Sequence, residues 1–312
     1  MTNNKLRIIF MGTPEFAVPS LEAIVRNGHS VAAVVTRPDA PKGRGLTLTK
    51  SPVKTKAEEL SIKVIDADNM KDPLFAAALK ELQPDLFAVV AFRILPNDVL
   101  SIPRLGSYNV HPSLLPLYRG AAPIQWAIAN GDKETGVSIF RLNSVIDGGD
   151  IIKQERFAIG DTETAGELSR RLSIEGADLL VSAINDIAEG RAATAVQNST
   201  LATPAPKLKK EDGLINFASD SLSILNRLRG FNPAPGSYTF FSGKRVNVIT
   251  ADHIDTKGNP GEVLNVNADG ITVAAGKGAI IIKTVKPEGR GIMAARDYAN
   301  GNKITKGVRF GS

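Results

Sequence analysis

The chain has 312 residues, of which 43% are hydrophobic and 22% charged, with a formal net charge of +6; this is an ordinary globular composition, and the length favours two domains. Cysteine is absent, which excludes disulfides, thiolate metal sites and cysteine nucleophiles. No apolar run is long enough to span a bilayer, and the first residues resemble a strand rather than a signal peptide, so we expect a cytoplasmic protein with no membrane partner.

The first two thirds of the chain alternate short apolar runs with helical patterns. These patterns predict strands at 6–11, 30–36, 62–65, 85–92 and from near Ser107, and helices at 16–27, 73–82 and 164–187. Strands that are apolar on both faces and alternate with helices are typical of a parallel sheet covered on both sides. We therefore predict an α/β domain for this part of the chain.

The composition changes at residues 190–206, which are small, polar and marked by proline, and which we interpret as a linker. Beyond the linker, a short helix is predicted at 221–229 and is followed by about five short strands separated by Gly, Asn and Asp turns. Such strands are typical of a small barrel or sandwich. The predicted division is therefore 1–189, 190–206 and 207–312.

The positive charge belongs to the last of these regions. Residues 207–312 contain 16 Lys/Arg and 9 Asp/Glu, whereas residues 1–206 contain 22 and 23. This asymmetry indicates a polyanionic partner, although a basic surface that contacts only solvent explains the count equally well.

Candidate catalytic side chains lie at the end of the strand that begins near Ser107. Strand alternation places Asn109 and His111 on the same face, and Pro112 ends the strand. Open α/β sheets bind ligands at the carboxyl ends of their strands. A histidine that exchanges protons, beside an amide donor, suits a carbonyl that becomes a tetrahedral oxyanion. Alternatively, both side chains only satisfy loop backbone groups.

Asp147 is the best candidate for a partner of His111. It precedes Gly148-Gly149, a turn in which the backbone can approach a ligand closely. A carboxylate at that position would raise the pKa of His111 and could relay a proton through water. An ordinary turn aspartate is the simpler explanation of the local sequence, and Asp150 is a weaker candidate for the same role.

Several common chemistries lack their motifs in this sequence. The turn Met11–Phe16 contains neither a G-x-G-x-x-G nor a P-loop motif, which disfavours dinucleotide and P-loop enzymes. There is no G-x-S-x-G elbow and no cluster of residues with metal-ligand spacing; Ser113 lies in a Ser-Leu-Leu-Pro loop that suits a ligand clamp. We therefore expect direct attack by the nucleophile of the substrate, without a metal.

These residues are similar to the signature of the folate-dependent formyltransferase family. The core of the similarity is NVHPSLLP (109–116), YRGAAPIQWAI (118–128), ETGVSIF (134–140) and IDGGDII (146–152). It extends over nearly the whole chain, with RIIFMGTPEFAVPSL (7–21), RPDAPKGRG (37–45), SPVK (51–54), APKLKKEDGLINF (205–217), RLRGFNPAPGSY (227–238) and GRGIMAARDY (289–298).

The resemblance implies a Rossmann-like N-terminal formyltransferase domain with a mostly parallel sheet and a C-terminal OB-like β-barrel domain. It implies that Asn109, His111 and Asp147 are the catalytic residues. The formyl donor would be 10-formyltetrahydrofolate. The residues implied to bind it are Ser113, Leu114, Leu115, Pro116 and Phe92.

The resemblance also implies that the acceptor is the α-amino group of methionine carried by initiator tRNA. We expect a monomer, although the sequence does not give the oligomeric state. Lys42 and Arg44, in a glycine-rich loop, would contact the acceptor stem, and Lys209 and Lys210 would bind tRNA in the C-terminal domain. Without the resemblance, the loop is better explained as a mobile surface loop.

In the mechanism expected from these assignments, the unprotonated amine attacks the formyl carbon. Asn109 and a protonated His111 stabilise the oxyanion, and Asp147 keeps His111 charged. The sequence departs from the family pattern at two places. The residues after Gly45 are less basic, and the segment 90–96 is one residue shorter, with Arg93 in place of a small residue. The second departure affects the folate pocket.

Three alternative functions are considered. A related formyltransferase could act on a small amine, such as a sugar nucleotide or glycinamide ribonucleotide; the basic C-terminal region disfavours it. A formyltetrahydrofolate hydrolase would use water as the acceptor. A non-catalytic RNA-binding protein would lack one of Asn109, His111 and Asp147, and all three are present. The sequence leaves open whether the Leu115–Pro116 bond is cis or trans.

Overall fold

The computed structural model describes residues 5–42 and 47–311. The described residues form two compact units, and neither unit is a single stretch of sequence. The first unit combines residues from 1–120, 135–157 and 169–205, and the second combines 121–134, 158–168 and 206–312. The predicted division into 1–189, 190–206 and 207–312 stays a prediction.

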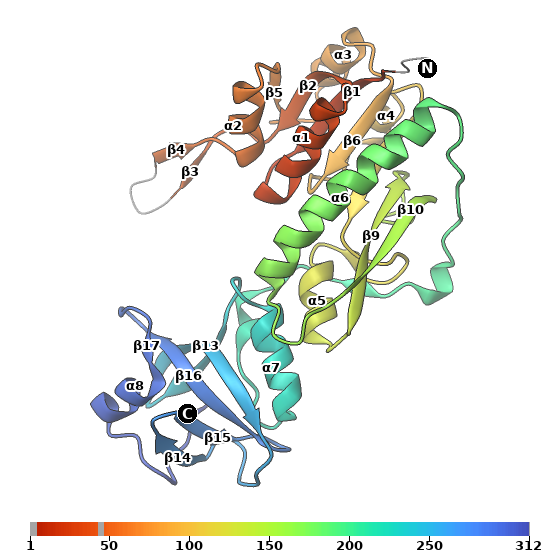
Figure 1. Ribbon diagram of the computed structural model, residues 1–312. Helices are drawn as coiled ribbons and strands as arrows, with labels where there is room; N and C mark the ends of the chain where they lie inside the picture. Colours follow the sequence, from red (N-terminus) through yellow and green to blue (C-terminus); the bar gives the residue numbers. More distant parts are fainter. Residues whose placement is uncertain (1–4, 43–46, 312) are drawn as a thin grey trace. The chain divides into compact units, whose positions relative to one another are not determined.

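The first unit is built on a seven-stranded sheet (Figure 1). In spatial order its strands are β10 (Ile151–Ala158), β9 (Glu134–Arg141), β7 (Ser107–His111), β6 (Leu86–Val90), β1 (Arg7–Gly12), β2 (Ser30–Thr36) and β5 (Val64–Asp66). The strands from β7 to β5 are parallel to their neighbours, and β9 is antiparallel to β7. The predicted α/β domain with a mostly parallel sheet is confirmed.

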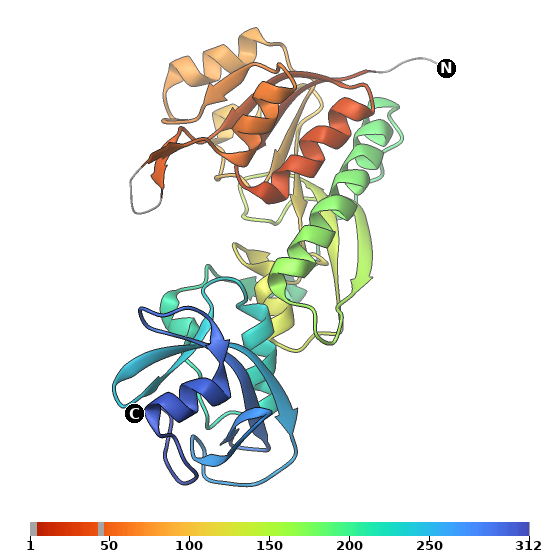
Figure 2. The same ribbon diagram turned by 60° about the vertical axis from the view of Figure 1, so that its left-hand side comes forward.

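Helices cover both faces of this sheet. On one face lie α1 (Val18–Arg26), which follows the 3-10 turn η1 (Glu15–Ala17), α2 (Pro52–Glu59) and most of α6 (Ala165–Ala188). Figures 1 and 2 show α1 and α6 side by side, and Arg26 of α1 forms a 3.6 Å ion pair with Asp178 of α6. The other face carries α3 (Pro73–Glu81) and α4 (Asn97–Leu100). A small hairpin of β3 (Ala40–Lys42) and β4 (Thr47–Thr49) follows β2.

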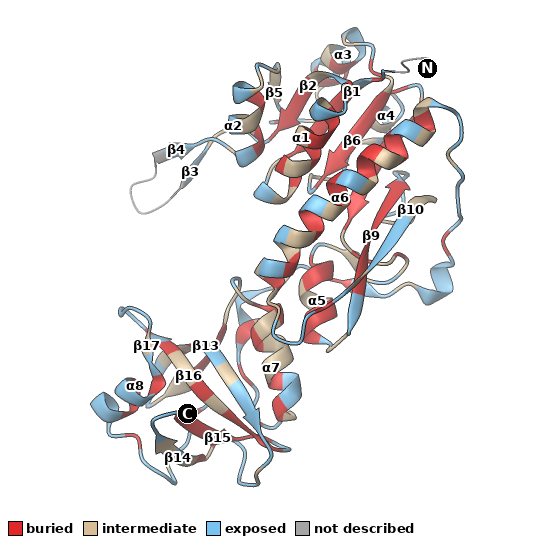
Figure 3. Cartoon of the chain, viewed as in Figure 1, coloured by how far each residue is buried: buried red, intermediate tan, exposed pale blue. Residues whose placement is uncertain are grey.

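Burial on both faces explains why the central strands are apolar throughout. Ile9 and Met11 of β1 pack in one cluster with Phe75 of α3, while Gly176 of α6 lies against Val110 of β7. Figure 3 shows β6 as buried along its length, and β1 is buried from Ile8 to Gly12. Alternation along β7 therefore turns Val110 towards α6 and turns its polar neighbours towards the face that carries α3 and α4.

The second unit contains an antiparallel sheet. Its strands run in the order β12 (Ser237–Phe241), β13 (Lys244–Ile254), β16 (Ala279–Pro287), β15 (Gly270–Ala274) and β14 (Val263–Asn267), and β17 (Met293–Ala294) also pairs with β16. Within the described residues the end strands β12 and β14 do not pair with each other. The all-β character is confirmed, but the predicted closure into a barrel is not.

Among the described residues, the second unit includes the helices α5 (Pro123–Ala129), α7 (Ser221–Gly230) and α8 (Ala295–Asn302). Ile224 and Leu228 of α7 and Tyr298 of α8 join the core beneath the sheet. Trp126 of α5 packs edge-on against Phe231, with ring centroids 5.7 Å apart. Among the residues that the structure describes, no helix combines the length and apolarity needed to cross a membrane.

Candidate active site

The carboxyl end of β7 carries the two polar side chains that strand alternation predicted to share a face. Asn109 is half-buried and lines a cavity, whereas His111 is 4% exposed. The side-chain amide of Asn109 makes no hydrogen bond with any described residue. Its donor is therefore available to a ligand in the cavity.

His111 is held by a backbone group on one side and faces a carboxylate on the other. Its Nε2 lies 2.9 Å from the carbonyl oxygen of Tyr118, and Nδ1 lies 3.8 Å from Oδ2 of Asp147. Because a carbonyl can only accept, Nε2 must carry a proton for the first contact to be a hydrogen bond. Phe140 contacts the imidazole edge-on, with a centroid distance of 6.4 Å. The predicted pairing of His111 with Asp147 is thus present in the geometry.

Burial lowers the pKa of the His111 imidazole, because loss of hydration of the charged form outweighs the attraction of Asp147 and the Tyr118 carbonyl, both of which raise it. The unperturbed pKa of histidine is about 6.5, so the lowered pKa favours the uncharged imidazole near neutral pH. Burial thus opposes the expectation that Asp147 keeps His111 charged, while the Asp147 carboxylate supports it, and the expectation stays a prediction. The depth of burial, which the local sequence does not reveal, sets the direction of the pKa shift.

Asp147 lies in the loop between β9 and β10, and its backbone is in the left-handed region with φ +50°. Its Oδ2 accepts a 2.8 Å hydrogen bond from the N–H of Gly120, which belongs to the short strand β8 (Arg119–Gly120). Gly120 has φ +130°, and a Cβ there would lie 2.5 Å from the carbonyl oxygen of Ala205. Glycine is therefore required at the position that donates to the Asp147 carboxylate. The backbone carbonyl of the rival candidate, Asp150, accepts from the Arg141 N–H at 2.9 Å.

A cavity of about 100 Å³ opens beside Asn109 and Asp147. Phe92, whose contact with folate stays a prediction, lines it, and so does Arg93, the residue that departs from the family pattern. Nε and Nη2 of Arg93 are buried and have no hydrogen-bond partner among the described residues. The apolar side chain of Ile146 lines the same cavity and is 60% exposed. The cavity thus offers apolar contact and unused donors beside the catalytic candidates.

The segment Ser113–Pro116, which is predicted to bind folate, forms hydrogen bonds with neighbouring protein groups. The hydroxyl of Ser113 donates to the carbonyl of Leu117 at 2.6 Å, and the N–H of Leu115 donates to the Ser138 hydroxyl at 3.1 Å. The peptide bond between Leu115 and Pro116 is cis. None of the residues from Ser113 to Pro116, Leu114 included, is among those that line the cavity, so their contact with folate stays a prediction.

The residues predicted to contact tRNA lie in different parts of the chain. The backbone of Lys42 ends β3, but its side chain and all of Arg44 lie outside the described residues. Lys209 and Lys210 are exposed at the 3-10 turn η3 (Lys210–Gly213) of the second unit.

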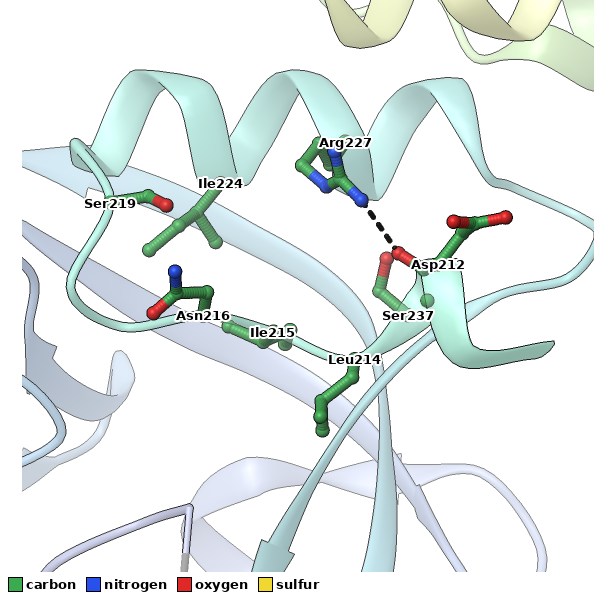
Figure 4. Close-up of a pocket in the computed structure, with 9 residues that line it drawn as sticks. Asp212, Leu214, Ile215, Asn216, Ser219, Ile224, Arg227 and Ser237 are labelled. Carbon is green, nitrogen blue, oxygen red and sulfur yellow. Dashed lines mark hydrogen bonds between the residues drawn. The ribbon is translucent and has the colours of Figure 1, made fainter. Parts of the chain in front are cut away.

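Behind η3 lies a second cavity, of about 220 Å³, in the second unit. Figure 4 shows Arg227 of α7 reaching across it to the backbone of Asp212, whose carbonyl accepts from Nη2 at 2.9 Å. Ser219 and Ser237 also line it, and their hydroxyls have no hydrogen-bond partner among the described residues. The cavity therefore presents unused polar groups, and its lining residue Asp212 lies two residues after the exposed Lys210.

The residues that hold the catalytic candidates were not predicted. The Tyr118 carbonyl and the Gly120 N–H are backbone groups, which no residue type marks in a sequence. Gln197 donates to the carbonyl of Asp147 at 2.9 Å, although it lies in the segment interpreted as a linker. A lone glutamine among small polar residues gave no signal, because its partners Gly149, Asp147 and Arg119 are 48, 50 and 78 residues away in sequence.

Comparisons with known proteins identify the family of the chain. Residues 5–184 match the family model described as formyl transferase, and residues 207–303 match that of the formyl transferase C-terminal domain. The methionyl-tRNA formyltransferase of Syntrophus aciditrophicus is 46% identical over 98% of this chain and 99% of its own length. That of Pelotomaculum thermopropionicum is 43% identical with the same coverage.

Solved structures with a similar fold include two that were determined with folates. HypX from Aquifex aeolicus in complex with tetrahydrofolic acid matches with a TM-score of 0.64 at 18% identity, over 95% of this chain and 47% of that chain. The N-formyltransferase from Helicobacter canadensis matches with a TM-score of 0.68 at 22% identity, over 89% and 98%. At 18% and 22% identity, these two matches show only that the fold is shared. The family matches and the near-full-length relatives show that the chain belongs to the methionyl-tRNA formyltransferase family of formyl transferases.

Proposed function

We propose that the chain transfers the formyl group of 10-formyltetrahydrofolate to the α-amino group of methionine carried by initiator tRNA. The observation that carries this proposal is the meeting of His111 and Asp147, 3.8 Å apart, beside a cavity that Asn109 lines. The relatives that are 43% and 46% identical over nearly their full length support the same reaction.

Asn109 is proposed to stabilise the oxyanion. Its amide has no hydrogen-bond partner among the described residues, and it sits at the cavity wall. A donor that is already in place where charge develops lowers the barrier without reorganisation, by roughly 3–4 kcal/mol in measured cases.

His111 is proposed to receive the proton that the attacking amine loses. Its Nε2–H is engaged by the Tyr118 carbonyl, so the lone pair of the neutral imidazole is on Nδ1, the atom that faces Asp147. The imidazolium that forms is stabilised by the carboxylate on one side and the carbonyl on the other, as in other His–Asp pairs. The same Nδ1 can then return the proton to the leaving nitrogen. The charge on His111 thus arises during the reaction rather than before it.

The cavity beside Asn109 and Asp147 suits a folate cosubstrate, which supplies the formyl carbon when bound. Phe92 and Ile146 offer apolar contact to its rings. The unpartnered Nε and Nη2 of Arg93 would donate to its carbonyl or carboxylate oxygens. The segment Ser113–Pro116 is proposed to complete the pocket. Groups of His, Asp or Glu that could hold a metal are absent from the described residues, and the proposed chemistry uses none.

The second unit is proposed to be an OB-type domain that binds tRNA. Lys209 and Lys210 are exposed at the turn that leads into Asp212, a residue of the cavity whose wall also includes Arg227. Cations and hydrogen-bond donors suit a phosphate backbone. Lys42 and Arg44 are proposed to contact the acceptor stem. We further propose that the enzyme acts in the cytoplasm as a monomer.

A formyl-transfer assay that compares initiator with elongator methionyl-tRNA tests the proposal. Formylation of the initiator tRNA in large excess over the elongator tRNA is expected. Formate release in the absence of tRNA would instead identify a hydrolase. Efficient transfer to an amino sugar nucleotide or to glycinamide ribonucleotide would identify a small-amine formyltransferase.

A further inference from the structure

Residues 190–206, which the sequence presents as a linker, are bound along the first unit for most of their length. Ala195 exchanges two backbone hydrogen bonds of 2.8 Å with Ile151 at the start of β10. Pro204–Ala205 (β11) pairs in parallel with Arg119–Gly120 of β8. Gln197 lies between these two attachments and is only 8% exposed.

Both polar atoms of the Gln197 side chain, Nε2 and Oε1, form hydrogen bonds with residues around the candidate active site. Nε2 donates to the carbonyl of Asp147 at 2.9 Å and to that of Gly149 at 2.6 Å. Oε1 accepts from the Arg119 guanidinium, at 2.7 Å from Nη2 and 3.2 Å from Nε. Carbonyls only accept and a guanidinium only donates, so the amide has a single orientation that satisfies all four contacts.

The loop that Gln197 holds has a backbone that needs support. Asp147 has φ +50°, a conformation that residues with a side chain rarely adopt. Two residues later the chain passes so close to its neighbour that a Cβ on Gly149 would lie 1.7 Å from the carbonyl oxygen of Arg141. Without the two bonds from Gln197, the turn would be free to relax, and the Asp147 carboxylate would move relative to His111.

We propose that Gln197 is a positioning residue for Asp147. It ties the carbonyls on both sides of Gly148 to Arg119, and so fixes the Asp147 turn against β8. The same strand presents the Gly120 N–H to the Asp147 carboxylate, and the residue before it, Tyr118, presents its carbonyl to His111. This inference rests on the catalytic role proposed for Asp147. Residues 190–206 then have a second role besides connecting the domains, which is to keep Asp147 in a fixed position relative to His111.

The test compares Gln197→Ala and Gln197→Glu with Asn198→Ala in the full-length enzyme. For Gln197→Ala, kcat is expected to fall about 10- to 100-fold, the usual cost of removing a group that orients a functional side chain, with little change in the KM for tRNA. Gln197→Glu keeps the Arg119 contact but places a carboxylate oxygen against two carbonyls, so it should lose at least as much. Asn198 is the matched control: it is exposed and its Oδ1 only caps the local turn, accepting from the Thr200 N–H at 3.1 Å.

A double-mutant cycle separates positioning from a general effect on folding. If Gln197 acts through Asp147, then Gln197→Ala should change kcat little in an Asp147→Ala background. The pKa of His111, followed by NMR, should fall in Gln197→Ala because the carboxylate that raises it has moved. An equal loss of kcat in both backgrounds, with an unchanged His111 titration, would overturn the inference.

The outcome for Asp147→Ala separates this inference from the function on which it rests. Near-normal turnover of Asp147→Ala would refute the proposed mechanism itself. An inactive Asp147→Ala together with wild-type kcat for Gln197→Ala would overturn the positioning role alone.

Discussion

The catalytic loops of the first unit and the basic turn of the second unit are built in opposite ways. His111 and Asp147 are enclosed, and each is held by a backbone group, the Tyr118 carbonyl or the Gly120 N–H. Lys209 and Lys210 instead stand exposed on a short 3-10 turn. Proton transfer needs fixed distances, whereas attraction of a polyanion acts over about 8–10 Å and tolerates mobile side chains. Changes in the first region should therefore affect turnover, and changes in the second should affect binding.

The largest effect is expected for Asp147→Ala. Because the carboxylate faces Nδ1 of His111 at 3.8 Å, its loss should lower kcat about 10²- to 10⁴-fold, the range for a positioned proton-transfer group. Filter binding of initiator tRNA should be unchanged. Asp150→Ala is the control, since that residue is the rival candidate in the same loop; a larger loss for Asp150→Ala would reverse the assignment.

Asn109→Ala should rank next. Removal of one oxyanion donor costs about 10²- to 10³-fold in kcat in other enzymes, and the Asn109 amide is free to act as such a donor. Single-turnover kinetics would measure the chemical step directly. Asn143→Ala is a matched control, because Asn143 lines the same cavity but its Oδ1 already accepts from the Val145 N–H at 2.9 Å. Equal losses for the two variants would contradict the oxyanion role.

Lys209→Ala and Lys210→Ala should have a smaller effect that is confined to binding. Each should raise the KM for tRNA a few-fold and reduce the slope of log K against log salt by about one, the signature of a lost phosphate contact. The measurement is tRNA binding over a range of salt concentrations. Lys80 is an exposed lysine on α3, and Lys80→Ala should leave the slope unchanged. A drop in kcat for the Lys209 or Lys210 variant would contradict the proposal that these lysines affect binding alone.

The subtlest prediction concerns the charge of His111. Its pKa should lie below the usual value because burial disfavours the charged form, and Asp147→Asn should lower the pKa further by removing a group that raises it. With a lowered folded-state pKa, the unfolded chain takes up the proton first, so stability falls as the pH drops below about 6.5 and is retained above it. NMR titration of the three histidines, assigned by substitution, provides the measurement. A His111 pKa above the usual value would restore the protonated form that the sequence suggested.

The candidate site shows which features are readable in a sequence. Strand alternation placed Asn109 and His111 on one face, and the Gly-Gly pair drew attention to Asp147; all three lie together as predicted. The charge of His111 could not be predicted, because it depends on burial by distant residues such as Phe140. Gln197 could not be found either, since its partners come from loops that lie far away along the chain.

What the sequence determined by itself is the local and periodic part of this protein: the α/β character of the first unit, the all-β character of the second, the imbalance of charge and the types of the side chains proposed to be catalytic. These follow from neighbours in the chain, where spacing and residue type carry the information. Only the tertiary structure decided whether the second sheet closes, how burial shifts the pKa of His111 and whether residues 190–206 are bound to the first unit. Each of those depends on contacts between segments that meet only after folding, because hydration and hydrogen bonding are set by whatever surrounds a group in space.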